Sequence, residues 1–169
     1  MLNLLYSKIN NIVPIIGIQI NNDNNYIIEY ANSDNITNEQ LSIVNDIIQS
    51  WPIDLAKILK IKDLDMWWKS QISRGFETSY GWKLGLAIED VTLLTGAFLL
   101  AKEASNLGLS QDAMIMDIEG VSHIISLEDL TSLMLQYGYY RSQLSLQYSN
   151  KKIAIENSAT MQEIEEIII

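Results

Sequence analysis

The sequence predicts a helix-rich α+β fold with an N-terminal β-hairpin, a short central strand and hairpin, and a long C-terminal helix. Several long segments place apolar residues three or four positions apart, which is the helical period. Short runs of β-branched and aromatic residues are separated by clusters of Asn, Asp or Gly, which is typical of strands joined by turns. Hydrophobic residues make up 48% of the 169 residues, enough to bury a core.

The first element expected along the chain is a β-hairpin. Val13–Ile20 and Tyr26–Tyr30 are rich in residues that favour strands. Asn21–Asn25 lies between them, and Asn and Asp tolerate turn conformations and bond to their own main chain. This hairpin is predicted to form an N-terminal unit of residues 1–35, followed by a helical α+β domain of residues 36–169.

Two helices are expected next. Thr37 and Gln40 match a capping box, in which the hydroxyl binds a first-turn amide and the longer side chain reaches back. The Trp51–Pro52 pair should end this helix, because the residue before a proline disfavours the helical conformation. A second helix is predicted from Asp54 to a glycine stop at Gly75.

A strand, a helix and a second hairpin follow. Residues 82–87 are predicted to form a short strand, and residues 89–107 a helix that is closed by Gly108. Residues 113–117 and 121–125 flank a compact turn that contains a glycine, so they predict a hairpin.

A long C-terminal helix is expected after this hairpin. Ser126 is its predicted cap, with Asp129 at the capping-box position. Apolar residues then continue at helical spacing to about Asn157. Thr160 is predicted to cap a last short helix that has Glu163 at its third position.

Composition and charge exclude several classes of protein. The formal net charge is −10 and the pI is near 4.4, so the surface repels a phosphate backbone and nucleic acid is not expected as a partner. The absence of cysteine excludes disulfides and thiolate metal sites. Polar residues interrupt the apolar N-terminus, which lacks the features of a signal peptide. No apolar run approaches the roughly 20 residues of a membrane span, so membrane insertion is not expected. No cofactor is expected either, because the sequence has no phosphate-binding loop.

No set of residues in the sequence predicts a reaction. His123 is the single histidine, and no nucleophile elbow accompanies it, so a structural or solvated role is favoured over a Ser-His-Asp set. Asp63 with Asp65, and Asp117 with Glu119, are the nearest pairs to a metal site, but further ligands are missing. The glycines do not form a phosphate-binding loop. The chain is therefore expected not to be an enzyme.

Clustered aromatic residues and the apolar C-terminal residues are the candidates for a partner interface. Adjacent residues on a helix point about a third of a turn apart, so an aromatic pair is buried only if two faces are covered. One large core or an interface would each explain these clusters, because Trp and Tyr dominate interface hot spots. The candidate interface residues are Trp67, Trp68, Tyr139, Tyr140, Ile167, Ile168 and Ile169.

The order of motifs resembles a domain family of unassigned biochemical function found at the C-terminal ends of bacteriophage tail and tail-fibre proteins. Residues 54–168 carry the resemblance through a Gly-Phe start, the helix LTGAFLLAKEA, the hairpin MDIEGVSHIIS, the helix start SLEDL, and IENSAT before MQEIEEI. The closing motif departs slightly, since Ser158 intervenes and Glu163 falls early. The matching positions are Asp117, Gly120, Ser126, Asp129, Leu130, Ile155, Ala159, Thr160 and Ile164.

The resemblance implies a virion structural protein of the tail, in a fibre, baseplate or adaptor, that acts through protein–protein interfaces without catalysis. Such a protein would assemble in the host cytoplasm, form homo- or hetero-oligomers and bind other tail proteins. A tail-fibre assembly chaperone that is absent from the mature virion is an alternative. A small hydrolase is another, with Glu89 or Asp90 paired with Asp117 or Glu119 as its two acidic groups. The partner, the copy number, the position in the particle and the host receptor stay open.

Overall fold

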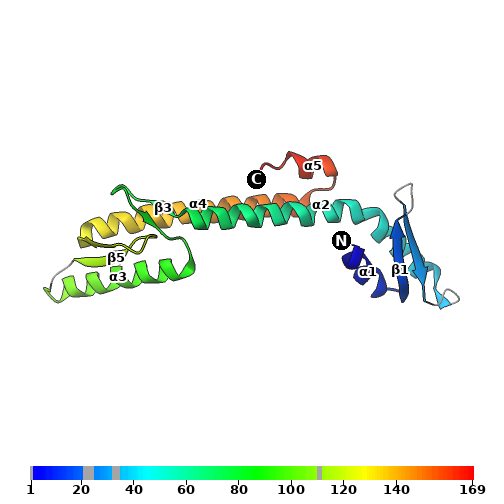
Figure 1. The fold of residues 1–169 in the computed structure, drawn as a ribbon, viewed down its shortest axis with the longest axis horizontal. Helices are drawn as coiled ribbons and strands as arrows, with labels where there is room; N and C mark the ends of the chain where they lie inside the picture. Colours follow the sequence, from blue (N-terminus) through cyan, green and yellow to red (C-terminus); the bar gives the residue numbers. More distant parts are fainter. Residues whose placement is uncertain (1, 21–24, 32–34, 110–111) are drawn as a thin grey trace. The chain divides into compact units, whose positions relative to one another are not determined.

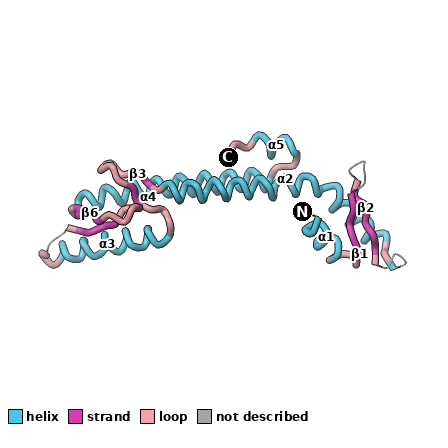
Figure 2. The backbone as a smooth tube through the Cα atoms, in the orientation of Figure 1, coloured by secondary structure: helices cyan, strands magenta, loops and turns pink. Residues whose placement is uncertain are grey.

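A computed structural model of the chain describes residues 2–20, 25–31, 35–109 and 112–169. The fold is α+β and helix-rich, as predicted, and its strands form two-stranded antiparallel pairs (Figures 1 and 2). An N-terminal hairpin, central strands and a long C-terminal helix are all present.

The chain divides into two compact units, and each has an apolar cluster of its own. The first unit contains residues 1–61 and 155–168, and the second contains residues 62–154 with Ile169. The boundary predicted after residue 35 falls inside the first unit.

The first unit begins with a helix that the sequence analysis did not predict, α1 (Leu2–Asn10). Leu5 and Ile9 lie about one helical turn apart and are fully buried. The Tyr6 hydroxyl donates a hydrogen bond of 2.9 Å to the Ile15 carbonyl oxygen, which ties the helix to the first strand. A helix this short is marginal alone, so its packing on the strands and on α2 is what stabilises it.

The predicted N-terminal hairpin is confirmed as the antiparallel pair β1 (Ile15–Ile20) and β2 (Tyr26–Tyr30). The pairing register shifts between Ile15 and Gly17. The predicted loop, Asn21–Asn25, lies outside the described residues except for Asn25.

The capping box at the start of α2 (Asn38–Arg74) is confirmed. The main-chain amide of Gln40 donates to the Thr37 hydroxyl at 3.2 Å, and the main-chain amide of Thr37 donates to the Gln40 side-chain oxygen at 2.9 Å. Gln40 Nε2 also donates to the Ile12 carbonyl oxygen at 3.3 Å. The cap therefore links the helix to the segment that leads into β1.

The predicted break at Pro52 is wrong, because α2 continues through this residue. A proline inside a helix removes one backbone hydrogen bond and costs about 3 kcal/mol. The preceding Trp51 is 1% exposed in the apolar cluster of the first unit, and burial of so large a side chain offsets much of that cost. Asp54, expected to start a new helix, instead lies within α2 and forms an ion pair of 2.7 Å with Lys8 of α1.

In the second unit, Gly75 ends α2 as predicted, with a φ of +73° that favours glycine. The chain then forms β3 (Phe76–Glu77), which pairs with β4 (Lys83–Leu84). Of the strand predicted at residues 82–87, only Lys83 and Leu84 form a strand. Their partner strand β3 also has just two residues, so the pairing cannot extend further.

The next elements match their predicted bounds to within one residue. They are α3 (Ile88–Asn106) and a hairpin of β5 (Ala113–Met116) and β6 (Ser122–Ile125). The turn of the hairpin contains Gly120 with a φ of +81°. The Ala87 amide at the start of α3 donates 2.9 Å to a carboxylate oxygen of Asp90, which supplies a cap.

The caps of the two C-terminal helices are also confirmed. The Asp129 amide donates to the Ser126 hydroxyl at 3.2 Å at the start of α4 (Leu127–Asn157). The Glu163 amide donates to the Thr160 hydroxyl at 3.2 Å at the start of α5 (Met161–Glu166). Across the residues that the structure describes, no helix has the length and apolar character needed to cross a membrane.

The core of the second unit joins α3, α4 and the β5–β6 hairpin. Their buried side chains form one cluster, and the hairpin lies between the two helices in Figure 1. The buried Tyr137 hydroxyl of α4 donates 2.8 Å to the Gly85 carbonyl oxygen. This bond holds the segment before α3 and so positions the first turn of that helix.

Candidate functional site

The residues predicted to form a partner interface are divided between the two compact units. On α2, Trp68 packs against Tyr148 with ring centroids 5.3 Å apart, and the Lys151 ammonium lies 4.8 Å from the centre of the Trp67 ring. Both tryptophans are half-buried against the apolar cluster of the second unit. They join α2 to α4 inside this unit, which is what the core interpretation of the aromatic pair expected.

The remaining candidates differ in exposure. Tyr140 is half-buried and packs against Phe76 at 5.4 Å, whereas its neighbour Tyr139 is 70% exposed. At the C-terminus, Ile168 is 84% exposed between two half-buried isoleucines. Tyr139 and Ile168 are thus open to a partner, and an interface role for all seven residues stays a prediction.

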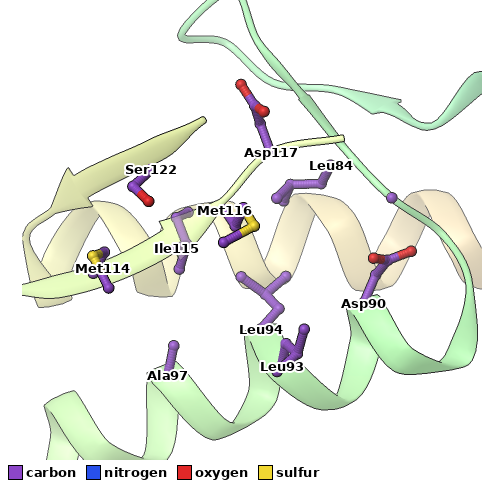
Figure 3. A pocket seen from close by; sticks show the side chains of 11 residues that line it. Leu84, Asp90, Leu93, Leu94, Ala97, Met114, Ile115, Met116, Asp117 and Ser122 are labelled. Carbon is purple, nitrogen blue, oxygen red and sulfur yellow. The ribbon is translucent and has the colours of Figure 1, made fainter. Parts of the chain in front are cut away.

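A more continuous apolar surface lies between α3 and β5 in the second unit. Side chains alternate along β5, so Ala113 and Ile115 are buried while Met114 and Met116 are exposed. Figure 3 shows both methionines above α3. Together with Leu93 and Leu94 of that helix they line a hollow of about 240 Å³. Leu93 on α3 is 72% exposed although it is a large apolar residue.

A second hollow continues the first along α3. The two hollows share Leu93, Ala97 and Met114 as lining residues, and the second extends to Leu100 and Asp112. Leu100 is 75% exposed. We call both hollows together the α3–β5 groove. An exposed apolar surface of this kind typically marks a binding site.

Two carboxylates lie at one end of the groove, those of Asp90 and Asp117 (Figure 3). Asp117 Oδ1 accepts hydrogen bonds from the Glu119 amide at 2.9 Å and from the Val121 amide at 2.8 Å. Its Oδ2 lies 2.8 Å from Nε2 of His123. Asp117 therefore organises the hairpin turn while it lines the groove.

An aromatic stack holds the His123 ring that hydrogen-bonds this carboxylate. The His123 ring stacks on Trp82 with centroids 4.4 Å apart, and Trp82 stacks on Tyr80 at 5.8 Å. The hydrogen bond with His123 holds the pKa of Asp117 below its usual range, and the turn amides act in the same direction against the effect of burial. Both oxygens of this carboxylate are therefore engaged within the hairpin, and the Asp117 side chain is only 7% exposed.

Of the reactive sets considered from the sequence, the structure brings one acidic pair to the same hollow, Asp90 and Asp117. His123 pairs with Asp117, so two candidates that the sequence analysis treated separately come together as a structural pair. Among the described residues, no three His, Cys, Asp or Glu side chains are grouped so that they could hold a metal ion. Asp65, one of the candidate metal ligands, accepts a hydrogen bond of 2.6 Å from the Tyr148 hydroxyl.

Sequence reasoning missed the groove, although a signal for it was present. The apolar residues of α3 that recur at helical spacing, Val91, Leu94, Phe98 and Ala101, leave Leu93 and Leu100 on other faces of the helix. In the AMIM strand, Met114 and Met116 fall on the face opposite Ile115. The signal in the sequence was that both α3 and β5 carry large apolar residues on the face opposite their buried face.

No family model, curated protein or solved structure matches the chain. The resemblance to the bacteriophage tail family therefore rests on the quoted motifs alone.

Proposed function

We propose that this chain is a non-enzymatic structural protein of the bacteriophage tail, in a fibre, baseplate or adaptor, that works by binding other proteins. One observation carries the binding role: Leu93, Leu100, Met114 and Met116 are exposed together along the α3–β5 groove. Apolar surface that stays in water is a free-energy cost that a partner would remove. The motif order of residues 54–168 supports the tail location.

Binding explains the groove better than catalysis does. Its apolar side chains carry no reactive group, and both carboxylates at the end of the first hollow already accept backbone hydrogen bonds. Asp90 accepts the Ala87 amide and Asp117 accepts two amides of its turn. Groups used in this way hold the walls of the groove in place for a partner.

The partners we propose are other tail proteins, in a homo- or hetero-oligomer that assembles in the host cytoplasm and ends in the virion. Tyr139 and Ile168, both largely exposed, provide further contact points beyond the groove. An acidic surface also favours partners with basic patches over nucleic acid.

Mass spectrometry of purified virions tests this proposal. The protein should be present at a fixed copy number relative to the major tail protein, and cross-linking should join it to a tail neighbour. A protein that is found in infected cells on tail-fibre subunits but is absent from virions would instead be the assembly chaperone. Absence from both would contradict the proposal.

A second candidate function is a small carboxylate-based hydrolase. The observation that favours it is that Asp90 and Asp117, named as an acidic pair from the sequence, line the same hollow. Two carboxylates across a cleft can act as acid and base on a glycosidic bond. Asp117→Asn should then abolish any lytic activity of the purified protein on cell-wall glycan, and unchanged lysis would remove this candidate.

A further inference from the structure

We propose that the α3–β5 groove binds an apolar polypeptide segment of a different protein, and that this segment carries lysine or arginine beside its apolar residues. The inference rests on the proposed protein-binding function and adds the chemistry of the partner. It follows from two properties of the groove, an apolar floor and a set of carboxylates at its ends.

The apolar part of the groove fits a segment of about four helical turns or six strand residues. Its lining runs along α3 from Asp90 to Ala104, which is about 21 Å at the helical rise. Gly96 and Ala97 are small, so the floor is low between the exposed Leu93 and Leu100. This relief allows side chains of a partner to enter between the two leucines.

The opposite wall is formed by methionines. Met114 is 69% exposed, and Met116 is exposed on the same face of β5. Methionine is unbranched and polarisable, so such a wall can repack around different apolar side chains. Two exposed methionines on one strand are therefore better explained by binding of a partner than by permanent exposure to water.

Carboxylates are the charged groups that line the described groove. Asp90 and Asp117 line the first hollow and Asp112 lines the second, while the lining residues include no lysine or arginine. Asp112 is exposed, whereas the Asp117 side chain is only 7% exposed and is held by His123 and two amides of the turn. A partner that carried acidic residues here would meet like charge, whereas a basic one would gain complementary contacts.

The same charges argue for a different protein over a second copy of this chain. Each copy carries a formal charge of −10, so two copies repel one another before they meet. A groove-to-groove dimer would also place the carboxylates of both copies at one interface. A partner segment with basic residues avoids both costs.

Two synthetic peptides test the inference with the full chain. Both have the same leucine face at helical spacing, and their polar positions are lysine in one and glutamate in the other. Fluorescence anisotropy should show that the lysine peptide binds at least about tenfold more tightly in roughly 50 mM NaCl, with the difference reduced in roughly 500 mM NaCl. Equal binding of the two peptides would overturn the charge requirement.

Variants locate the binding on the groove. The double variant Leu93→Ser with Leu100→Ser should weaken the lysine peptide by about tenfold or more, because apolar contact is lost. Leu135→Ser is the matched control, since Leu135 on α4 is 72% exposed and lies outside the groove lining. Asp112→Asn should weaken binding at low salt and have no effect at high salt. Thermal melting followed by circular dichroism checks that each variant is folded.

Each outcome decides between the possible occupants. Peptide binding that the double leucine variant leaves unchanged would overturn the groove as the site. A dimer in sedimentation that this variant dissociates would show that a second copy is the occupant and would also overturn the inference. A protein that is present in virions but fails the peptide test retains its proposed tail function and loses the groove assignment.

Discussion

Gly85 has no room for a side chain, because a Cβ atom there would overlap the Asp90 carboxylate. That carboxylate caps α3 through the Ala87 amide. We expect Gly85→Ala to displace the cap and to lower the free energy of unfolding by about 1–3 kcal/mol, as measured by urea denaturation. Gly138 in α4 is the control: nothing lies within 4 Å of a Cβ there, so Gly138→Ala should stabilise by up to about 1 kcal/mol. The same sign of change for both variants would contradict this account.

The carboxylate of Asp117 should make stability depend on acid pH. Its folded pKa is lowered, chiefly by the His123 hydrogen bond, so its contribution is fully present above its unfolded pKa of about 4. The contribution is lost as the pH falls through the lower folded value. The melting temperature of Asp117→Asn should therefore lie below that of the wild type at pH 6, and the gap should shrink below about pH 4. A gap that is unchanged at low pH would argue against a stabilising role for the ionised Asp117 carboxylate.

The side chains that control local structure were largely predictable, whereas the groove was not. The hydroxyls of Thr37, Ser126 and Thr160 cap helices as the sequence indicated, because a cap depends on residues three positions apart. The exposure of Leu93 and Met114 depends on how α3 and β5 pack, which involves residues about twenty positions apart. Helix caps can therefore be predicted from the sequence, whereas the binding surface can be identified only from the tertiary structure.

At the scale of elements, Pro52 provides a test of what holds α2 together. If burial of Trp51 carries the helix across the proline, restoring the missing amide should add stability. We expect Pro52→Ala to raise the free energy of unfolding by up to about 3 kcal/mol and to slow amide exchange in the adjacent turns of α2. Pro14→Ala, at the exposed residue before β1, should change stability by less than about 1 kcal/mol. If Pro52→Ala lowers the free energy of unfolding instead, packing of the proline ring must stabilise the protein by more than the missing hydrogen bond costs.

Pro52 was predicted to break a helix that continues, whereas α1 is a helix that was not predicted. Leu2–Asn10 contains polar residues among its leucines, so its composition argues against a signal peptide without predicting a helix. Leu5 and Ile9 are spaced for one helical face, but a segment of nine residues is too short to predict from periodicity alone. Its helical state depends on packing against the β1–β2 hairpin and α2, which no local pattern encodes.

At the scale of the whole molecule, the two compact units should respond separately to core substitutions. Trp51→Ala removes the largest fully buried side chain of the first unit and should destabilise it by about 3–5 kcal/mol. Leu130→Ala is the counterpart in the second unit, at about 2–5 kcal/mol.

Hydrogen exchange measured by mass spectrometry separates local from global effects of these substitutions. Trp51→Ala should remove protection in α1 and the β1–β2 hairpin while the β5–β6 hairpin stays protected, and Leu130→Ala should do the reverse. Each apolar cluster draws its members from one unit, which is the reason to expect this separation. However, α2 and α4 contribute residues to both units. Loss of protection in both hairpins from either substitution would mean that these helices unfold cooperatively and couple the two clusters.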